Sequence, residues 1–198
     1  WIGRSHERVG ARDRVTGALR YTADLSFDDA LHVKLVYVGG ARSKINRIDR
    51  SAALKVPGVA CVLIADDLPQ PIARFGPAFS DRPILATGET KFFGEPVAAV
   101  VADTKDAAEA AATLVQVEAE PLAAVLSVED ALDPAAALVQ DPSLRPKDPL
   151  ANTNVLREWT FGWGNTDGVA PHLIVEHEYR FPMVTHFAIE PHVFIAAA

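Results

Sequence analysis

The fold is decided by a stretch in the middle of the chain, Phe93-Gly94-Glu95-Pro96-Val97-Ala98-Ala99-Val100-Val101-Ala102. Its last six residues are all apolar, which is typical of a strand buried on both faces. Asp103 or Thr104 then offers a side-chain cap for a following helix. That helix carries a stripe of small residues, which lets a helix lie close to a sheet: Ala107, Ala108, Ala111, Ala112 and Val115.

Further strands are expected around this central unit. Residues 31–37 alternate in polarity and predict a half-buried strand whose apolar face carries Leu31, Val33, Leu35 and Tyr37. A helix is expected at residues 50–56, because Asp49 can cap it and Pro57-Gly58 can end it. The remaining strands are predicted at residues 44–48, 59–64 and 115–119. This order of elements indicates an α+β fold with helices on one side of a mixed sheet.

Composition and charge narrow the class of protein. The 198 residues are 49% hydrophobic and 23% charged, which is typical of a globular domain. A net charge of −7 argues against nucleic acid or an anionic membrane as a partner, since the basic cluster of Arg4, Arg8, Arg12 and Arg14 is interrupted by acids. The chain contains no secretory segment or apolar span, so we expect a cytoplasmic protein. It begins with Trp1 rather than methionine, so we expect an upstream segment to have been removed.

The sequence lacks the motifs that several kinds of functional site require. The single cysteine, Cys61, excludes an internal disulfide and a cysteine-rich metal site, and we expect it to be a buried, inert thiol. Gly3, Gly10 and Gly17 are too widely spaced for a phosphate-binding loop. No serine lies in a Gly-x-Ser-x-Gly elbow, which disfavours a hydrolase triad.

Two groups of residues are candidates for a functional site. His186, Glu190 and His192 are ligand-type residues at close spacing, but a turn with ordinary backbone hydrogen bonds is the preferred interpretation, and a site completed by residues elsewhere is a further alternative. Glu95 lies between Gly94 and Pro96 beside an apolar strand, where desolvation would raise its pKa and suit proton transfer. A structural cap or ion pair is nevertheless the preferred interpretation of Glu95, because a glutamate at the entrance of a strand more often has such a role. Glu118 and Glu120 are expected to face solvent.

The later part of the chain is less regular. Residues 69–83 form a proline-rich loop, expected to cover a surface or to lie beside a substrate. Residues 133–149 contain four prolines and indicate a linker. Residues 173–179 predict a strand and residues 193–198 are apolar, yet no partner sheet is evident. We therefore expect residues 173–198 to be disordered or to pair with a second copy of the chain.

An ordered series of motifs runs through the chain: Arg14-Val15-Thr16-Gly17-Ala18-Leu19-Arg20-Tyr21-Thr22-Ala23-Asp24, Asp81-Arg82-Pro83-Ile84-Leu85-Ala86, Gly94-Glu95-Pro96-Val97-Ala98, Gly162-Trp163-Gly164-Asn165 and Glu190-Pro191-His192. The series resembles the N-terminal part of the large subunit of molybdenum hydroxylases. This family includes xanthine dehydrogenase, aldehyde oxidase and carbon monoxide dehydrogenase-like enzymes. The sequence departs from it at Gly39-Gly40-Ala41-Arg42, where many members have Arg-Ser-Pro-His, so the substrate stays unassigned.

The resemblance implies a domain organisation. It implies an N-terminal strap at residues 1–14, an α/β hammerhead domain at residues 15–125, a linker at residues 126–172 and the start of a molybdopterin-binding domain at residues 173–198. Intact members oxidise aldehydes, purines, N-heterocycles or carbon monoxide at a molybdenum–pterin cofactor. Electrons leave through 2Fe-2S centres and FAD on partner domains or subunits.

The family's cofactor-contacting and catalytic motifs have no counterpart here, so no catalytic, cofactor-binding or metal residue is expected in this chain. The leading hypothesis is a fragment that needs the rest of the large subunit as its partner, together with the iron–sulfur and FAD parts. A free-standing binding or assembly module is the alternative. A small self-contained enzyme using Glu95, or His186 with Glu190 and His192, is the third hypothesis.

Overall fold

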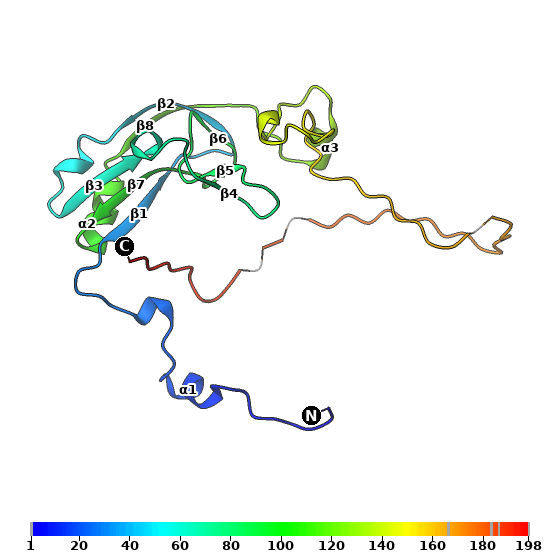
Figure 1. Ribbon diagram of the computed structural model, residues 1–198, viewed down its shortest axis with the longest axis horizontal. Coiled ribbons are helices and arrows are strands. Elements are labelled where there is room, and N and C mark those ends of the chain that lie inside the picture. Colours follow the sequence, from blue (N-terminus) through cyan, green and yellow to red (C-terminus); the bar gives the residue numbers. More distant parts are fainter. Residues whose placement is uncertain (1, 166, 183, 186, 198) are drawn as a thin grey trace. The chain divides into compact units, whose positions relative to one another are not determined.

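The computed structural model describes residues 2–165, 167–182, 184–185 and 187–197. The chain divides into two units, Leu31–Phe161 and a second one made of Trp1–Ala30 with Gly162–Ala198. The first unit holds the described strands and the helix predicted beside them (Figure 1). It is therefore the unit in which a functional site can be built.

The central strand of the first sheet is β7, Pro96–Ala102. It pairs antiparallel with β1, His32–Tyr37, on one side and with β3, Val59–Ile64, on the other. Val97, Ala98 and Val100 are fully buried, because their neighbours cover both faces of this strand. The uninterrupted apolar run thus has the position predicted for it.

The second sheet is built around β2, Ser43–Asp49. It lies between β6, Glu89–Thr90, and β8, Gln116–Pro121, again with antiparallel pairing. A short hairpin, β4 Arg74–Phe75 with β5 Arg82–Pro83, lies inside the segment expected to be a loop. The α+β class is confirmed, but the expected mixed sheet is wrong in detail, because every pairing among the described strands is antiparallel.

Helix α2, Lys105–Ala112, covers one face of the first sheet (Figure 1). The Thr104 hydroxyl accepts a hydrogen bond from the Ala107 backbone N–H at 3.2 Å, which confirms one of the two predicted caps. Ala108 and Ala111 are buried against the sheet. They join a core that also contains Val36, Val62, Val97 and Val100.

The alternating strand β1 buries the opposite face from the one expected. Val33, Leu35 and Tyr37 are exposed by 61%, 37% and 51%, whereas Val36 is buried. Helix α2 packs on the Lys34 and Val36 side, and the Lys34 ammonium lies 3.2 Å from the Glu109 carboxylate. Alternation showed that the two faces differ, but the helix position decides which one is covered.

Two smaller expectations also need correction. Residues 50–56 contain only the short 3-10 helix η2, Ala53–Lys55, because β2 extends through Asp49 and its carboxylate accepts from the Ser51 N–H at 2.9 Å. Cys61 is half-buried rather than fully buried, since it lies on β3, an edge strand of the first sheet.

The proline-rich segment after β8 is ordered by side-chain contacts. It contains α3, Val128–Leu132, capped by Ser127, and η4, Pro142–Leu144. Arg145 is 6% exposed, and its guanidinium donates to the backbone oxygens of Leu150, Thr153 and Val155 at 3.1 Å each. Through Phe161 this segment belongs to the first unit, so the part expected to be a linker packs in a defined way.

The second unit has little regular structure among its described residues. It contains α1, Ala11–Thr16, which overlaps the end of the expected strap at residues 1–14, and η1, Thr22–Asp24. Residues 173–179 form no strand and are exposed, although the His177 and Tyr179 rings contact each other edge to face at 4.8 Å. The 193–197 stretch likewise lacks a strand, and Ala198 lies outside the described residues.

Across the described ranges, every helix is too short and too polar to cross a membrane.

Candidate functional site

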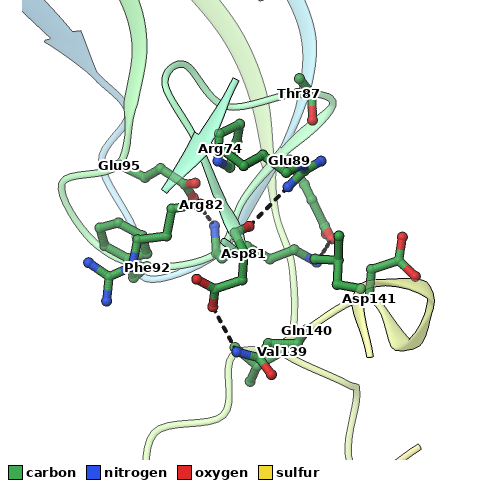
Figure 2. A pocket seen from close by; sticks show the side chains of 13 residues that line it. Arg74, Asp81, Arg82, Thr87, Glu89, Phe92, Glu95, Val139, Gln140 and Asp141 are labelled. Atoms are coloured by element: carbon green, nitrogen blue, oxygen red, sulfur yellow. Dashed lines mark hydrogen bonds and ion pairs between the residues drawn. The ribbon is translucent and has the colours of Figure 1, made fainter. Parts of the chain in front are cut away.

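A pocket of about 310 Å³ opens on the Leu31–Phe161 unit (Figure 2). Three parts of the chain line it: the β4–β5 hairpin, the turn between β6 and β7, and the segment that precedes Arg145. Its charged and polar lining residues are Arg74, Asp81, Arg82, Thr87, Glu89, Lys91, Glu95, Gln140 and Asp141. We take this pocket as the candidate site because it gathers titratable groups in a concave surface.

Glu95 is the buried acid of the pocket. It is 3% exposed, and its carboxylate accepts a hydrogen bond from the Lys91 backbone N–H at 2.5 Å. Gly94 has a φ of 87°, which turns the chain sharply before β7 begins. Burial raises the pKa of Glu95 and outweighs the Lys91 hydrogen bond, which lowers it. The predicted desolvation of Glu95 is therefore confirmed.

Glu89 also lines the pocket, but its pKa is shifted in the opposite direction from that of Glu95. Burial alone would raise its pKa, yet hydrogen bonds from Lys91 and Arg42 lower it overall. Arg42 Nη2 lies 2.9 Å from Glu89 Oε2, and the Lys91 ammonium pairs with the other carboxylate oxygen. The pocket thus holds one carboxyl that favours its proton and another that favours ionisation.

Asp81 joins two of the three lining segments. Gln140 Nε2 donates to Asp81 Oδ2 at 2.7 Å, and Arg74 Nη1 donates to the Asp81 backbone oxygen at 2.9 Å. A Cβ on Gly76 would lie 2.1 Å from the Phe79 oxygen, so the hairpin requires glycine there. Sequence reasoning missed the meeting of Asp81 and Gln140, because 59 residues separate them and no local pattern connects them.

The other candidates of the sequence do not assemble into a site. Glu190 and His192 are exposed, and His186 lies outside the described residues. Within those parts of the chain that the structure describes, no group of three His, Cys, Asp or Glu side chains could hold a metal ion. Glu118 and Glu120 face solvent as predicted.

The pocket residues do not fit a molybdenum–pterin cofactor. Asp81, Glu89 and Glu95 already form hydrogen bonds within the protein, and three carboxylates in one small pocket disfavour the phosphate group of such a cofactor. Lys91, a cation of the lining, is paired with Glu89. The network is therefore a polar junction that connects three chain segments, and burial raises the pKa of its carboxyl at Glu95.

Replacing Glu95 by glutamine should change how stability depends on pH. The folded state raises the pKa of Glu95 above its ordinary value of 4.5, so the folded chain binds this proton more tightly than the unfolded chain. The resulting stabilisation is complete below the ordinary pKa and is lost as pH rises through the raised one. Glu95→Gln should therefore be more stable relative to the wild type at neutral pH than at acidic pH.

Urea denaturation measures this difference between about pH 4 and pH 8, a range that includes the titration of a carboxyl group with a raised pKa. Glu118→Gln, on an exposed strand position, is the matched control and should follow the wild type. Parallel curves for Glu95→Gln and the wild type would contradict the raised pKa.

Comparison with known proteins identifies the domain. The family model described as "Aldehyde oxidase and xanthine dehydrogenase, a/b hammerhead domain" matches residues 16–123. A probable xanthine dehydrogenase subunit of Bacillus subtilis is 31% identical over 188 residues, which cover 94% of this chain and 24% of that protein.

Solved structures of the same family share the fold. Quinoline 2-oxidoreductase from Pseudomonas putida has a TM-score of 0.62 and 36% identity, over 70% of this chain and 18% of that one. CO dehydrogenase from Oligotropha carboxidovorans has a TM-score of 0.63 and 32% identity, over 69% of this chain and 17% of that one. The chain spans about a quarter or less of the length of these relatives. The resemblance seen in the motifs is thereby confirmed, and the chain belongs to the aldehyde oxidase and xanthine dehydrogenase family, with the α/β hammerhead domain at residues 16–123.

Proposed function

We propose that this region is a supporting domain of a molybdenum-dependent hydroxylase and performs no chemical step itself. In the intact enzyme it supports the part that binds the cofactor and shapes the entrance used by the substrate. The main support is the hammerhead match over residues 16–123, in relatives that are about four or more times longer. The pocket adds to this, because its carboxylates are bound to neighbouring groups of the same domain.

The parent activity follows from the family. It is the oxidation of an aldehyde, purine, N-heterocycle or related substrate, with redox chemistry supplied by a molybdenum–pterin cofactor bound elsewhere in the large subunit. We assign the 2Fe-2S centres and FAD to partner domains or subunits, and the protein to the cytoplasm. This chain contributes the rigid junction of Asp81, Glu89 and Glu95, which fixes the hairpin and the turn before β7.

We further propose that the domain boundaries implied by the motifs apply to the intact protein. Residues 15–125 would then form the hammerhead, and residues 173–198 would begin the molybdopterin-binding domain. The absence of strands among the described residues of 173–179 and 193–197 agrees with segments that form a sheet only with later parts of the large subunit.

Metal analysis of the purified 198-residue chain tests the proposal, after expression in cells that make the cofactor. We expect no stoichiometric molybdenum or pterin on this chain. One molybdenum atom per chain would overturn the supporting role, because it would show that these residues hold the cofactor.

A second arm uses a large subunit that carries this domain. Glu95→Gln should leave the turnover rate per bound molybdenum within about twofold of the wild type, since a residue without a chemical role adds nothing to transition-state stabilisation. A loss of about a hundredfold, the scale expected for a general acid or base, would instead make Glu95 a catalytic residue.

A further inference from the structure

Three exposed aromatic rings and an exposed arginine, two of which also line the pocket, make up what we call the aromatic–arginine patch: Phe75, Arg82, Phe92 and Phe93. Phe75, Phe92 and Phe93 are exposed by 55%, 41% and 75%. Exposed aromatic rings next to arginine have the composition of protein–protein contact sites, in which these residue types carry most of the binding energy.

Arg82 lies beside two of the rings of the patch. Phe75 of β4 pairs directly with Arg82 of β5, so their side chains leave the same side of the hairpin. The Arg82 guanidinium carbon lies 5.4 Å from the centre of the Phe92 ring. Figure 2 shows the Arg82 side chain extending beside Phe92 and away from the Asp81–Gln140 contact. Phe93 follows Phe92 directly in the chain.

Arg82 differs from the other basic residues of the pocket. Arg74 donates to the Asp81 backbone oxygen and Lys91 pairs with Glu89. Among the residues that the structure describes, the Arg82 guanidinium has no hydrogen bond or ion pair, although its charge partly offsets the rise that burial causes in the pKa of Glu95. A guanidinium stacked on a ring keeps its N–H groups free along its edge, where a carboxylate binds best.

Charge complementarity defines the partner. A free, oriented guanidinium among aromatic rings favours a carboxylate that is flanked by apolar groups. The net charge of −7 on the whole chain disfavours a nucleic acid, whose recognition needs a concentrated basic surface. The pocket beside the patch also offers Pro83, Val139 and Leu144 as apolar lining for an inserted side chain.

We propose that the aromatic–arginine patch is a docking surface for an extended protein segment that presents a carboxylate beside an apolar side chain. The carboxylate pairs with Arg82, and the apolar side chain packs against Phe92 and Phe93. This inference goes beyond the supporting role and stands independently of it, because it concerns a surface that the fold alone creates.

Nuclear magnetic resonance titration of the 198-residue chain tests the proposal. The probe is a six-residue peptide in which aspartate alternates with leucine, and its matched control carries asparagine in place of each aspartate. We expect the acidic peptide to shift the signals of residues 74–76, 82–84 and 91–94. The asparagine peptide should bind at least about fivefold more weakly, since it cannot form the charged pair.

Variants identify the contact. Arg82→Gln should weaken binding of the acidic peptide about fivefold and remove the preference for it over the asparagine peptide. Phe92→Ala should weaken both peptides. Arg47→Gln is the control, because Arg47 is exposed on β2 and already pairs with Asp49. An unchanged spectrum away from the patch shows that each variant is folded.

Three outcomes would overturn the proposal. The acidic peptide fails to bind at millimolar concentration, or it binds no better than the asparagine peptide, or its shifts map away from the patch. Sedimentation of the chain alone adds a further outcome. A dimer that Arg82→Gln dissociates would assign the surface to a second copy of this chain instead of a separate acidic segment.

Discussion

Arg145→Met is expected to lower the stability of the segment between α3 and Phe161 by about 3 kcal/mol, the scale of losing a buried charged hydrogen-bonding group. Arg145 has a side chain that is 4% exposed, and its guanidinium also lies 3.3 Å from the Asp148 carboxylate. Three backbone oxygens, of Leu150, Thr153 and Val155, accept from it at 3.1 Å. Methionine fills a comparable volume but leaves these acceptors without a donor.

The stability lost in Arg145→Met should also affect the lining of the pocket. Val139, Gln140, Asp141 and Leu144 line it just before Arg145. If the following loop opens, the Gln140 side chain loses its fixed position and the 2.7 Å bond to Asp81 weakens. Hydrogen exchange of residues 139–155 measures the effect, because the logarithm of the exchange rate of the backbone amides rises in proportion to the stability lost by local opening.

Two variants separate packing from hydrogen bonding. Arg145→Lys keeps the charge but loses the planar fork that reaches several acceptors, so it should recover only part of the stability. Lys147→Met changes an exposed residue two positions away and should leave exchange unchanged. Exchange in Arg145→Met that equals the wild type would show that the segment is held by other contacts.

Arg145 illustrates what the sequence alone does not reveal. Its acceptors lie within about ten residues, but backbone oxygens carry no sequence signal and the surrounding prolines indicate only an extended segment. The Asp81–Gln140 contact also has no sequence pattern that would predict it, because it joins a hairpin to a segment far away in the chain. Local patterns cannot predict contacts that depend on how distant segments fold together.

Other features are determined by local sequence patterns, and these were predicted. Strand β7 is a continuous apolar run, and α2 begins at a threonine cap. The burial of Glu95 follows from its neighbours, since Gly94 and Pro96 place it at the entrance of that strand. These elements depend on residues adjacent in the chain, so they can be predicted without knowledge of the tertiary fold.

The pairing of strands lies between these two cases. The strands were recognisable, but alternation in β1 did not tell which face the helix covers, and the division into two three-stranded antiparallel sheets and a hairpin was not predicted. The reason is that an alternating pattern indicates that one face of a strand is apolar, but it does not indicate which element packs against that face. Here α2 covers the Val36 side and leaves Val33, Leu35 and Tyr37 exposed.

The contact between α2 and the first sheet yields the second large expected effect. Ala111 is fully buried where α2 contacts β1 and β7. Ala111→Leu should lower the free energy of unfolding by about 2–3 kcal/mol, because extra carbon atoms in a packed core force the helix away from the sheet. Urea denaturation followed by circular dichroism measures the loss.

Ala110→Leu is the matched control on the same helix. Ala110 is exposed, so leucine there should change stability by no more than about 0.5 kcal/mol. Both substitutions replace alanine by leucine inside the same helix, so differences in helix propensity cancel between them. An equal effect of the two variants would show that α2 does not depend on small residues to approach the sheet. A large loss confined to Ala111→Leu would instead assign the alanine stripe to close packing of the hammerhead core.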